Sequence, residues 1–396
     1  MNFARRRPAA ILFSSSLLWN VSLGMFFILV PLYARELGMS GVAIGSLVAV
    51  PGLLQVAMNF VGGASADRLG GKTMTYVAYS LTIVAGTLFA LSETFAAMFA
   101  AQLLLTVARA IFWPANWTLA SYLPGEASRN MGRLNAISSG GQILGTALIG
   151  MIVALWDFRA GFWSTVVVVA AATAVFIPLH GHPPSSAART NSIAGTYIAL
   201  FRRADIRLAV LCSYIGSMSM ALGTSFYPIL VADGGYGSEI TGWVVSVRGL
   251  GSMLAGLTLA QFVRSTDQAR APLIAGLMST VPALMSGLFV NPWLLCLFLF
   301  FLGMGTGMMA VYNQMVVARA STAATRGSAM AMPGMGWALG FFITPMVTGM
   351  LKDTVGLRSA FVILGTVMVL VALCLPALQR RAAARTREHL ERIGEA

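Results

Sequence analysis

Two stretches of this chain are related: Gly132-Arg-Leu-Asn-Ala-Ile-Ser-Ser-Gly-Gly-Gln-Ile-Leu-Gly145 and Gly327-Ser-Ala-Met-Ala-Met-Pro-Gly-Met-Gly-Trp-Ala-Leu-Gly340. They align without gaps at an offset of 195 residues, and five of their fourteen positions are identical. Further along, Arg159-Ala-Gly-Phe162 corresponds to Arg358-Ser-Ala-Phe361 after a four-residue insertion. A duplication of this kind predicts two structurally similar halves.

The composition indicates which solvent these halves face. Of the 396 residues, 57% are hydrophobic and only 10% are charged, and the mean hydropathy is +0.79. A soluble domain carries about 25% charged residues, whereas a bilayer core ~30 Å thick is crossed by about 20 apolar residues in a helix. We therefore predict an all-α polytopic membrane protein of twelve transmembrane helices in two pseudo-symmetric six-helix bundles, with spans at 9–33, 41–65, 73–92, 94–120, 133–156, 160–180, 206–231, 240–263, 272–290, 292–318, 328–351 and 359–378.

The longest polar stretch lies at the centre of the chain and separates six spans from six. It suggests an N-terminal bundle over 1–180, a cytoplasmic linker over 181–205, a C-terminal bundle over 206–378 and a basic tail over 379–396. Duplicated halves around a linker are typical of alternating-access transporters, which bind the solute near mid-membrane.

The distribution of basic residues predicts the orientation. The net charge is +13. With the N-terminus inside, inward segments hold 20 Lys and Arg residues, outward segments hold 4 and the remaining 2 lie within spans. The positive-inside rule therefore places both termini in the cytoplasm of a plasma (bacterial inner) membrane. The basic surplus reflects topology in the lipid bilayer, so we expect no nucleic-acid partner, and we expect a monomer.

A polar turn lies between the second and third predicted spans, Gly63-Ala-Ser-Ala-Asp-Arg-Leu-Gly-Gly-Lys72. It resembles the cytoplasmic loop signature of the major facilitator superfamily, G-x-L-A-D-R-x-G-R-K, although Ser65 replaces the leucine and Gly71 the first basic residue. The resemblance implies an MFS-like fold and a gating latch, in which Asp67 binds charged or dipolar partners that separate as the inner gate opens. We expect five residues to act in gating: Gly63, Asp67, Arg68, Gly70 and Lys72.

Other positions extend the resemblance over almost the whole chain. Arg109 fits the intramembrane arginine of that superfamily, and the run from 326 to 361 is similar to its penultimate helix and loop. The corresponding loop of the second half has no acid where one is usual. In the fifth span, Gly145 is followed by Thr146 rather than by the proline that the superfamily's antiporters often carry, which argues against an efflux antiporter.

Charge is rare inside the predicted spans. All 13 acidic residues fall in loops, in tails or at span ends, whereas Arg109 and Arg248 lie within spans. A buried arginine costs about 3 kcal/mol or more and cannot lose its charge. Either a substrate anion neutralises these arginines, or Asn, Gln and backbone carbonyls satisfy them. With no mid-membrane carboxylate, proton antiport of a cationic drug lacks its usual residue.

Polar and aromatic residues surround the two arginines. Trp113 and Asn116 share a helical face with Arg109, and Met308, Tyr312 and Asn313 share one in the tenth span. The resemblance implies that the first, fourth, seventh and tenth helices line the central cavity. The candidate substrate-binding residues are Arg109, Arg248, Trp19, Asn20, Trp113, Asn116, Tyr214, Met308, Tyr312 and Asn313. Helix packing is the alternative explanation for each stripe.

Catalytic, cofactor-binding and metal-binding motifs are not evident in the sequence. It contains no His-Glu-x-x-His, nucleophile elbow or nucleotide loop, and the histidines and three cysteines form no ligand pattern. We expect a secondary transporter of a small organic anion or carboxylate, which uses no cofactor and is open to coupling by a proton or another ion. The alternative is a proton-coupled drug or metabolite efflux antiporter.

Overall fold

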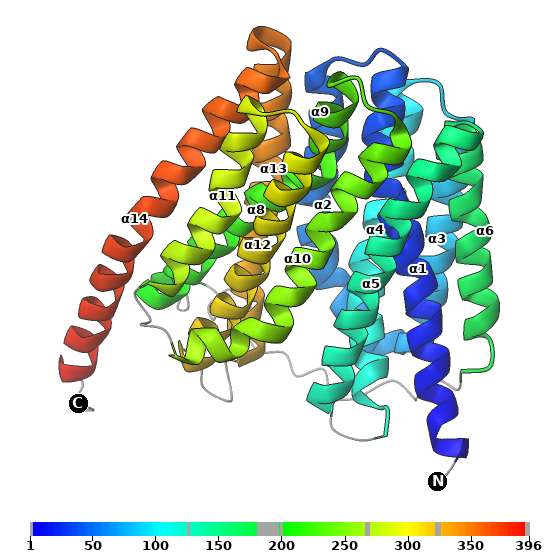
Figure 1. Ribbon diagram of the computed structural model, residues 1–396. Helices are drawn as coiled ribbons and strands as arrows, with labels where there is room; N and C mark the ends of the chain where they lie inside the picture. The colour runs from blue at the N-terminus through cyan, green and yellow to red at the C-terminus, as the bar shows by residue number, and fades with distance from the viewer. Residues whose placement is uncertain are drawn as a thin grey trace. The chain divides into compact units, whose positions relative to one another are not determined.

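All the regular secondary structure in the described part of the chain is helical. The computed structural model (Figure 1) describes residues 3–124, 127–179, 198, 201–265, 270–320 and 326–392. The helices are α1 (Phe3–Glu36), α2 (Gly41–Leu69), α3 (Gly71–Leu91), α4 (Phe95–Ser121), α5 (Ala127–Leu155), α6 (Phe158–Phe176), α8 (Ala204–Ser225), α9 (Tyr227–Asp233), α10 (Ser238–Ser265), α11 (Ala271–Leu288), α12 (Pro292–Ala320), α13 (Arg326–Val355) and α14 (Leu357–Arg392).

These helices confirm the twelve-helix membrane fold. Each predicted span falls on helical structure, and ten helices of the described residues are long and apolar enough to cross a bilayer. A shorter apolar stretch, Gly41–Gln55, belongs to α2. The last helix continues well past the predicted end of its span, through the basic residues of the predicted tail to Arg392.

The seventh span differs from the prediction of one continuous helix over 206–231. α8 ends at Ser225 and a new helix, α9, begins at Tyr227. Pro228 explains the break, because proline has no N–H to donate to the carbonyl of Thr224 and its ring clashes with that carbonyl in a continuous helix. In the first turn of α9 the missing donor costs nothing.

The chain divides into two compact units. Unit 1 consists of Met1–Arg189 and Thr224–Gly249, and unit 2 of Thr190–Gly223 and Leu250–Ala396. In unit 1, α1 packs against α5 and α6, and α3 packs against α4; in unit 2, α11 packs against α12 and α14. The predicted linker over 181–205 lies mostly outside the described residues, so the predicted domain boundaries remain predictions.

Paired glycines allow the closest helix contacts in both units. A Cβ on Gly145 of α5 would collide with the carbonyl oxygen of Val21 on α1, and one on Gly336 of α13 would collide with the carbonyl oxygen of Val210 on α8. Backbones approach this closely only where a residue has no side chain. A Cβ on Gly141 would lie 2.6 Å from the carbonyl oxygen of Leu17 on α1, whereas one on Gly340 would overlap the Ser217 hydroxyl of α8 and lie 3.0 Å from the carbonyl oxygen of Tyr214. The repeated glycines therefore pack helices within each unit, as close-approach residues.

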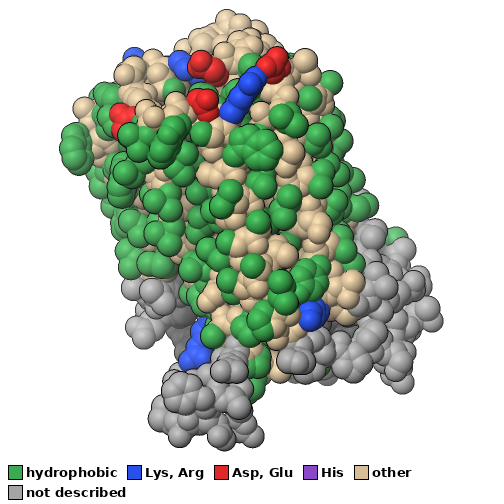
Figure 2. Space-filling model, turned by 90° about the vertical axis from the view of Figure 1, so that its right-hand side faces the viewer, with side chains coloured by type: hydrophobic (Ala, Val, Ile, Leu, Met, Phe, Trp, Pro, Cys, Tyr) green, Lys and Arg blue, Asp and Glu red, His purple; other side chains and the backbone are tan. Residues whose placement is uncertain are grey.

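Apolar side chains cover the outside of the helices, as expected in lipid. Figure 2 shows one face whose middle is mostly hydrophobic, while the Lys, Arg, Asp and Glu side chains gather near its ends. Leu155, Trp156 and Trp293 are more than two-thirds exposed. Such side chains are stable in contact with hydrocarbon or at its interface, where tryptophan is enriched.

Candidate substrate site

Arg109 lies in the middle of α4, and its side chain is half-buried in unit 1. The guanidinium carbon is 5.8 Å from the centroid of the Phe27 ring on α1. A cation over an aromatic face gains about 0.5–2 kcal/mol from the ring quadrupole. Among the described residues, none hydrogen-bonds the buried Nε of Arg109. The Phe27 ring thus stabilises the positive charge, and the Nε N–H donor is not used by any described residue.

Arg248 is the second intramembrane arginine. It lies ten residues into α10, about 15 Å along the helix axis. It is only 6% exposed, and it is the sole charged side chain that is buried to this degree within the described residues. Every acidic residue whose side chain is described is exposed or half-buried. The two arginines therefore make the described interior of unit 1 electropositive.

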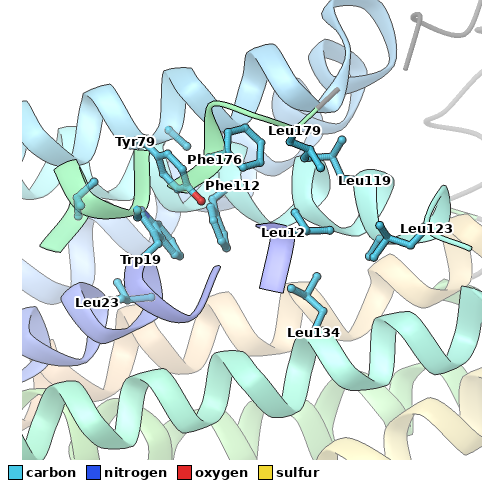
Figure 3. Close-up of a cluster of buried hydrophobic side chains, with 14 residues drawn as sticks. Leu12, Trp19, Leu23, Tyr79, Phe112, Leu119, Leu123, Leu134, Phe176 and Leu179 are labelled. Carbon is cyan, nitrogen blue, oxygen red and sulfur yellow. The ribbon is translucent and has the colours of Figure 1, made fainter. Parts of the chain in front are cut away.

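Trp19 lies in the aromatic core of unit 1 (Figure 3). Its ring stacks on Phe112 with centroids 3.6 Å apart, and its indole N–H donates to Thr82 Oγ1 at 3.1 Å. The side chain is fully buried. Trp113 packs edge-on against Trp19 at 6.4 Å but remains half-buried. Of these two predicted site residues, Trp113 is the one with accessible ring surface.

Asn20 and Asn116 belong to a chain of buried hydrogen bonds. Ser16 Oγ donates to Asn116 Oδ1 at 3.0 Å, and Asn116 Nδ2 donates to Thr75 Oγ1 at 3.4 Å. Asn20 Nδ2 donates to the Ser16 carbonyl at 2.9 Å, and Gln142 Nε2 donates to Asn20 Oδ1 at 3.0 Å. These amides therefore connect α1, α3, α4 and α5, and most of their hydrogen-bonding capacity is used inside the unit.

The predicted site residues of unit 2 occupy different environments. Met308 and Tyr312 are 2% and 5% exposed in the hydrophobic core of the unit, and Tyr214 is half-buried on α8. Asn313 of α12 donates to the carbonyl of Ala209 at 3.2 Å and accepts from the amide N–H of Ser213 at 3.1 Å. Its side chain thereby joins α12 to one turn of α8.

A pocket of 180 Å³ opens beside Asn313 in unit 2. Residues of α8, α12 and α13 line it, and those that the structure describes are all uncharged: Ser213, Gly216, Thr306, Met309, Ala310, Asn313, Val317, Pro333 and Trp337. Asn313 is the one predicted site residue in this set. The pocket walls combine an indole, a thioether, two hydroxyls and small apolar groups, which suit a largely apolar group of a solute.

Sequence reasoning missed Trp337, Thr306 and Ser213. The predicted site residues came mainly from the first, fourth, seventh and tenth spans, whereas Trp337 lies on the eleventh. A signal was present in the repeat, where tryptophan at 337 stands opposite glutamine at 142. A large aromatic residue that replaces an amide at an equivalent position indicates a local difference between the halves.

The predicted gating turn is a very tight connection. Only Gly70 separates α2 from α3, and it has φ 83° and ψ 145°, a conformation that side chains disfavour. The ammonium group of Lys72 lies 5.8 Å from the centroid of the Tyr76 ring. The latch itself remains a prediction, because the side chains of Asp67 and Arg68 and the surroundings of Gly63 are outside what the structure describes.

The apolar helices, ten of which within the described residues are long enough to cross a bilayer, define the class of a polytopic membrane protein. The sequence profile of the Major Facilitator Superfamily matches residues 11–264 and 208–394. This chain belongs to that superfamily, and it is a transporter rather than an enzyme.

Curated relatives match over a limited stretch. The quinolone resistance protein NorA of Staphylococcus aureus is 26% identical over 144 residues, which are 36% of this chain and 37% of NorA. The multidrug resistance protein MdtH of Proteus mirabilis is 31% identical over 144 residues, 35% of this chain and 36% of MdtH. The chain thus matches little more than a third of the length of these relatives.

Solved structures agree in fold over nearly the whole chain. A variant of the nucleoside transporter NupG superposes with a TM-score of 0.81 at 15% identity, covering 94% of this chain and 99% of that one. A POT family transporter in complex with 5-aminolevulinic acid superposes with a TM-score of 0.80 at 15% identity, covering 96% and 98%. At such low identity the likeness concerns the fold alone.

Proposed function

We propose that this protein is a secondary transporter that moves a small amphipathic organic anion, such as an aromatic carboxylate, by alternating access. The observation that carries the proposal is Arg109, whose buried Nε has no hydrogen-bond partner within the described residues. A carboxylate oxygen that accepts from this N–H would form a charge-assisted hydrogen bond, which is about twice as strong as a neutral one.

The balance of buried charge supports an anion over a cation. Arg109 and Arg248 lie inside helices of unit 1, and none of the described carboxylates is buried. A cationic solute near these arginines would meet like charges in a medium of low dielectric constant, where repulsion is strong. An anion would instead offset the cost of keeping an arginine in the membrane.

The gating turn supplies the second part of the proposal. The tight Gly70 turn joins α2 to α3, and a Cβ on Gly71 would lie 2.9 Å from the carbonyl oxygen of Ala115 on α4. A turn packed this closely would transmit movement of α2 directly to α4, the helix that carries Arg109. A proton or another ion would couple transport to a gradient across the plasma membrane.

A second candidate function is efflux of drugs or metabolites. The resemblance of a third of the chain to quinolone and multidrug resistance proteins favours it. The uncharged lining of the pocket in unit 2 is also compatible with chemically varied apolar solutes. The two candidate functions differ in whether they need the positive charge of Arg109. Efflux of neutral or cationic drugs would not depend on it.

The test uses three probes with the same ring and different charge: 2-naphthoate, 2-naphthamide and 2-naphthylmethylamine. Binding to the purified full chain is measured by thermal shift and equilibrium titration, and transport is measured in proteoliposomes loaded on either side. We expect 2-naphthoate to bind most tightly. Arg109→Gln should weaken its binding about 10-fold or more, which corresponds to about 1.5 kcal/mol, and Arg109→Lys should recover part of the loss.

The control variant is Arg358→Gln, which changes an exposed arginine at the start of α14. It should leave all three affinities unchanged. Tighter binding of the amine than of the acid, insensitive to Arg109→Gln, would overturn the anion proposal in favour of drug efflux. Accumulation of naphthoate outside rather than inside right-side-out vesicles would establish export.

A further inference from the structure

The pocket of unit 2 has the features of a site for a ring. We propose that it binds a flat, uncharged aromatic group of the transported solute, with Trp337 as the stacking surface. This inference rests on the proposed function, since it concerns the part of the solute that carries no charge.

The size of the pocket suits one or two fused rings. Its volume is 180 Å³, whereas an engineered apolar cavity of about 150 Å³ accommodates benzene. Gly216 is the one glycine among the described lining residues. A Cβ on Gly216 would lie 3.4 Å from Met309 Cβ, an ordinary contact, so a methyl group fits there and a longer side chain would occupy the pocket itself.

Trp337 offers a ring surface for stacking. The residue is 40% exposed and lines the pocket. It stacks on Phe341 one turn further along α13, with centroids 5.4 Å apart and planes at 28°. Phe341 thus holds the orientation of the indole. Offset stacking of aromatic rings adds to the affinity gained from apolar burial alone.

The polar groups of the pocket disfavour a charged ligand. Thr306 Oγ1 already donates to the carbonyl of Gly303 at 2.8 Å, so it is left mainly as an acceptor. Asn313 uses its amide on the backbone of α8. A carboxylate needs several donors to replace its water shell, and a cation needs a negative partner. None of the described lining residues is charged, so the pocket suits a neutral ring system.

The equivalent position in unit 1 is filled differently. Gln142 of α5 corresponds to Trp337 in the sequence repeat, and its amide donates to Asn20 at 3.0 Å. There the amide ties two helices together, whereas the indole borders the pocket. The ring site is therefore a property of the second half and not of the shared architecture.

The experiment measures binding of 2-naphthamide and 2-naphthoate to the full chain by tryptophan fluorescence quenching and by thermal shift. Trp337→Leu should weaken both probes by about three- to tenfold, because both carry the same ring. Trp293→Leu is the matched control, since Trp293 is 83% exposed on α12 and does not line the pocket. It should leave both affinities unchanged.

Two pocket-filling variants make the test independent of tryptophan. Ala310→Leu places a larger side chain at an exposed lining position, and Gly216→Val extends into the pocket beyond the methyl that fits. Both should weaken the two probes at least as much as Trp337→Leu does, while Gly216→Ala should have a smaller effect. Unchanged melting temperatures without ligand would show that each variant folds.

The outcomes separate this inference from the proposed function. Both proposals are supported if the pocket variants lower the affinity for both probes and Arg109→Gln lowers the affinity for 2-naphthoate alone. Unchanged binding in Trp337→Leu and Ala310→Leu overturns the ring site, whatever Arg109→Gln does. If the pocket variants weaken the amide while Arg109→Gln leaves the acid unaffected, the ring site stands and the anion proposal is wrong. Failure of wild type to bind either probe also overturns the ring site.

Discussion

At the scale of single residues, two asparagines have matching structural roles in the two halves. Asn116 of α4 accepts a hydrogen bond from Ser16 of α1, and Asn313 of α12 bonds the backbone of α8. Each therefore links the fourth helix of its half to the first. Since buried amides are stable only when their hydrogen bonds are made, these side chains fix helix spacing near the candidate sites.

The first prediction concerns Arg248, the most deeply buried charge of the described residues. Its guanidinium is planar and permanently charged. If Arg248 contacts the solute carboxylate, Arg248→Gln should reduce the binding free energy of 2-naphthoate by about 1.5–3 kcal/mol. Its affinity should then fall about 10- to 150-fold. Binding of 2-naphthamide should change little. Arg248→Lys should recover only part of the affinity, because an ammonium cannot make the two-pronged contact.

Arg358→Gln again serves as the control for Arg248, and the melting temperature reports folding. An equal loss of affinity for 2-naphthoate and 2-naphthamide, or a large drop in melting temperature, would assign Arg248 a structural role. An unchanged affinity for 2-naphthoate in a well-folded variant would remove Arg248 from the site.

At the scale of helices, close packing depends on which glycine faces a neighbour. Gly145 and Gly340 contact α1 and α8 respectively, so closely that an added Cβ would overlap existing atoms. Gly140 and Gly334 lie on the same two helices, and no described residue comes within 4 Å of a Cβ built on either. Glycines a few residues apart should therefore respond to alanine in opposite ways.

The second prediction uses this difference. Gly145→Ala and Gly340→Ala should each lower the free energy of unfolding by about 1–3 kcal/mol, because the added methyl forces the helices apart. Gly140→Ala and Gly334→Ala should be neutral or slightly stabilising, since alanine is the better helix former by up to about 1 kcal/mol. Thermal unfolding in detergent measures all four. Equal effects at all four positions would contradict the packing argument.

The third prediction concerns the turn between α2 and α3. Gly70 has φ 83° and ψ 145°, a region that costs other residues about 1–3 kcal/mol. Gly70→Ala should therefore lower the melting temperature and slow transport more than it weakens binding, because the turn belongs to the predicted gate. Ser80→Ala, at an exposed position of α3, is the control. A normal transport rate in Gly70→Ala would separate this turn from gating.

At the scale of the whole molecule, the uneven distribution of basic residues determines the predicted topology. Inward segments hold 20 Lys and Arg residues against 4 in outward segments. The net charge of +13 therefore concerns membrane insertion. The orientation can be tested at single positions, because the ends of α13 and α14 are helical and described.

The fourth prediction tests that orientation. In a background without Cys212, Cys296 and Cys374, a cysteine in Lys352→Cys should react with a membrane-impermeant maleimide added outside intact cells. The same substitution at Arg380, an exposed residue of α14 on the predicted cytoplasmic side, should react only after the cells are opened. The reverse pattern of labelling would show that the termini face outward.

The amino-acid sequence by itself determined the helical membrane class, the twelve spans and the family. These properties follow from local features, namely runs of about 20 apolar residues, a short turn motif and a repeat offset of 195 residues. Each is read from neighbouring residues or from a direct comparison of the halves. The break at Pro228 shows the limit, because hydropathy continues across this proline although the helix does not, whereas α4 continues through Pro114.

Only the tertiary structure decided which candidate side chains are engaged and which line open space. Trp19 is of a residue type that often binds solutes, but it is fully buried and contacts Phe112 and Thr82. Trp337 was not among the site residues predicted from the sequence, yet it lines the pocket. Periodicity gives the face of a helix on which a residue lies, whereas a neighbouring helix determines whether that face is filled. That packing joins residues far apart in the chain, so it cannot be read from local patterns.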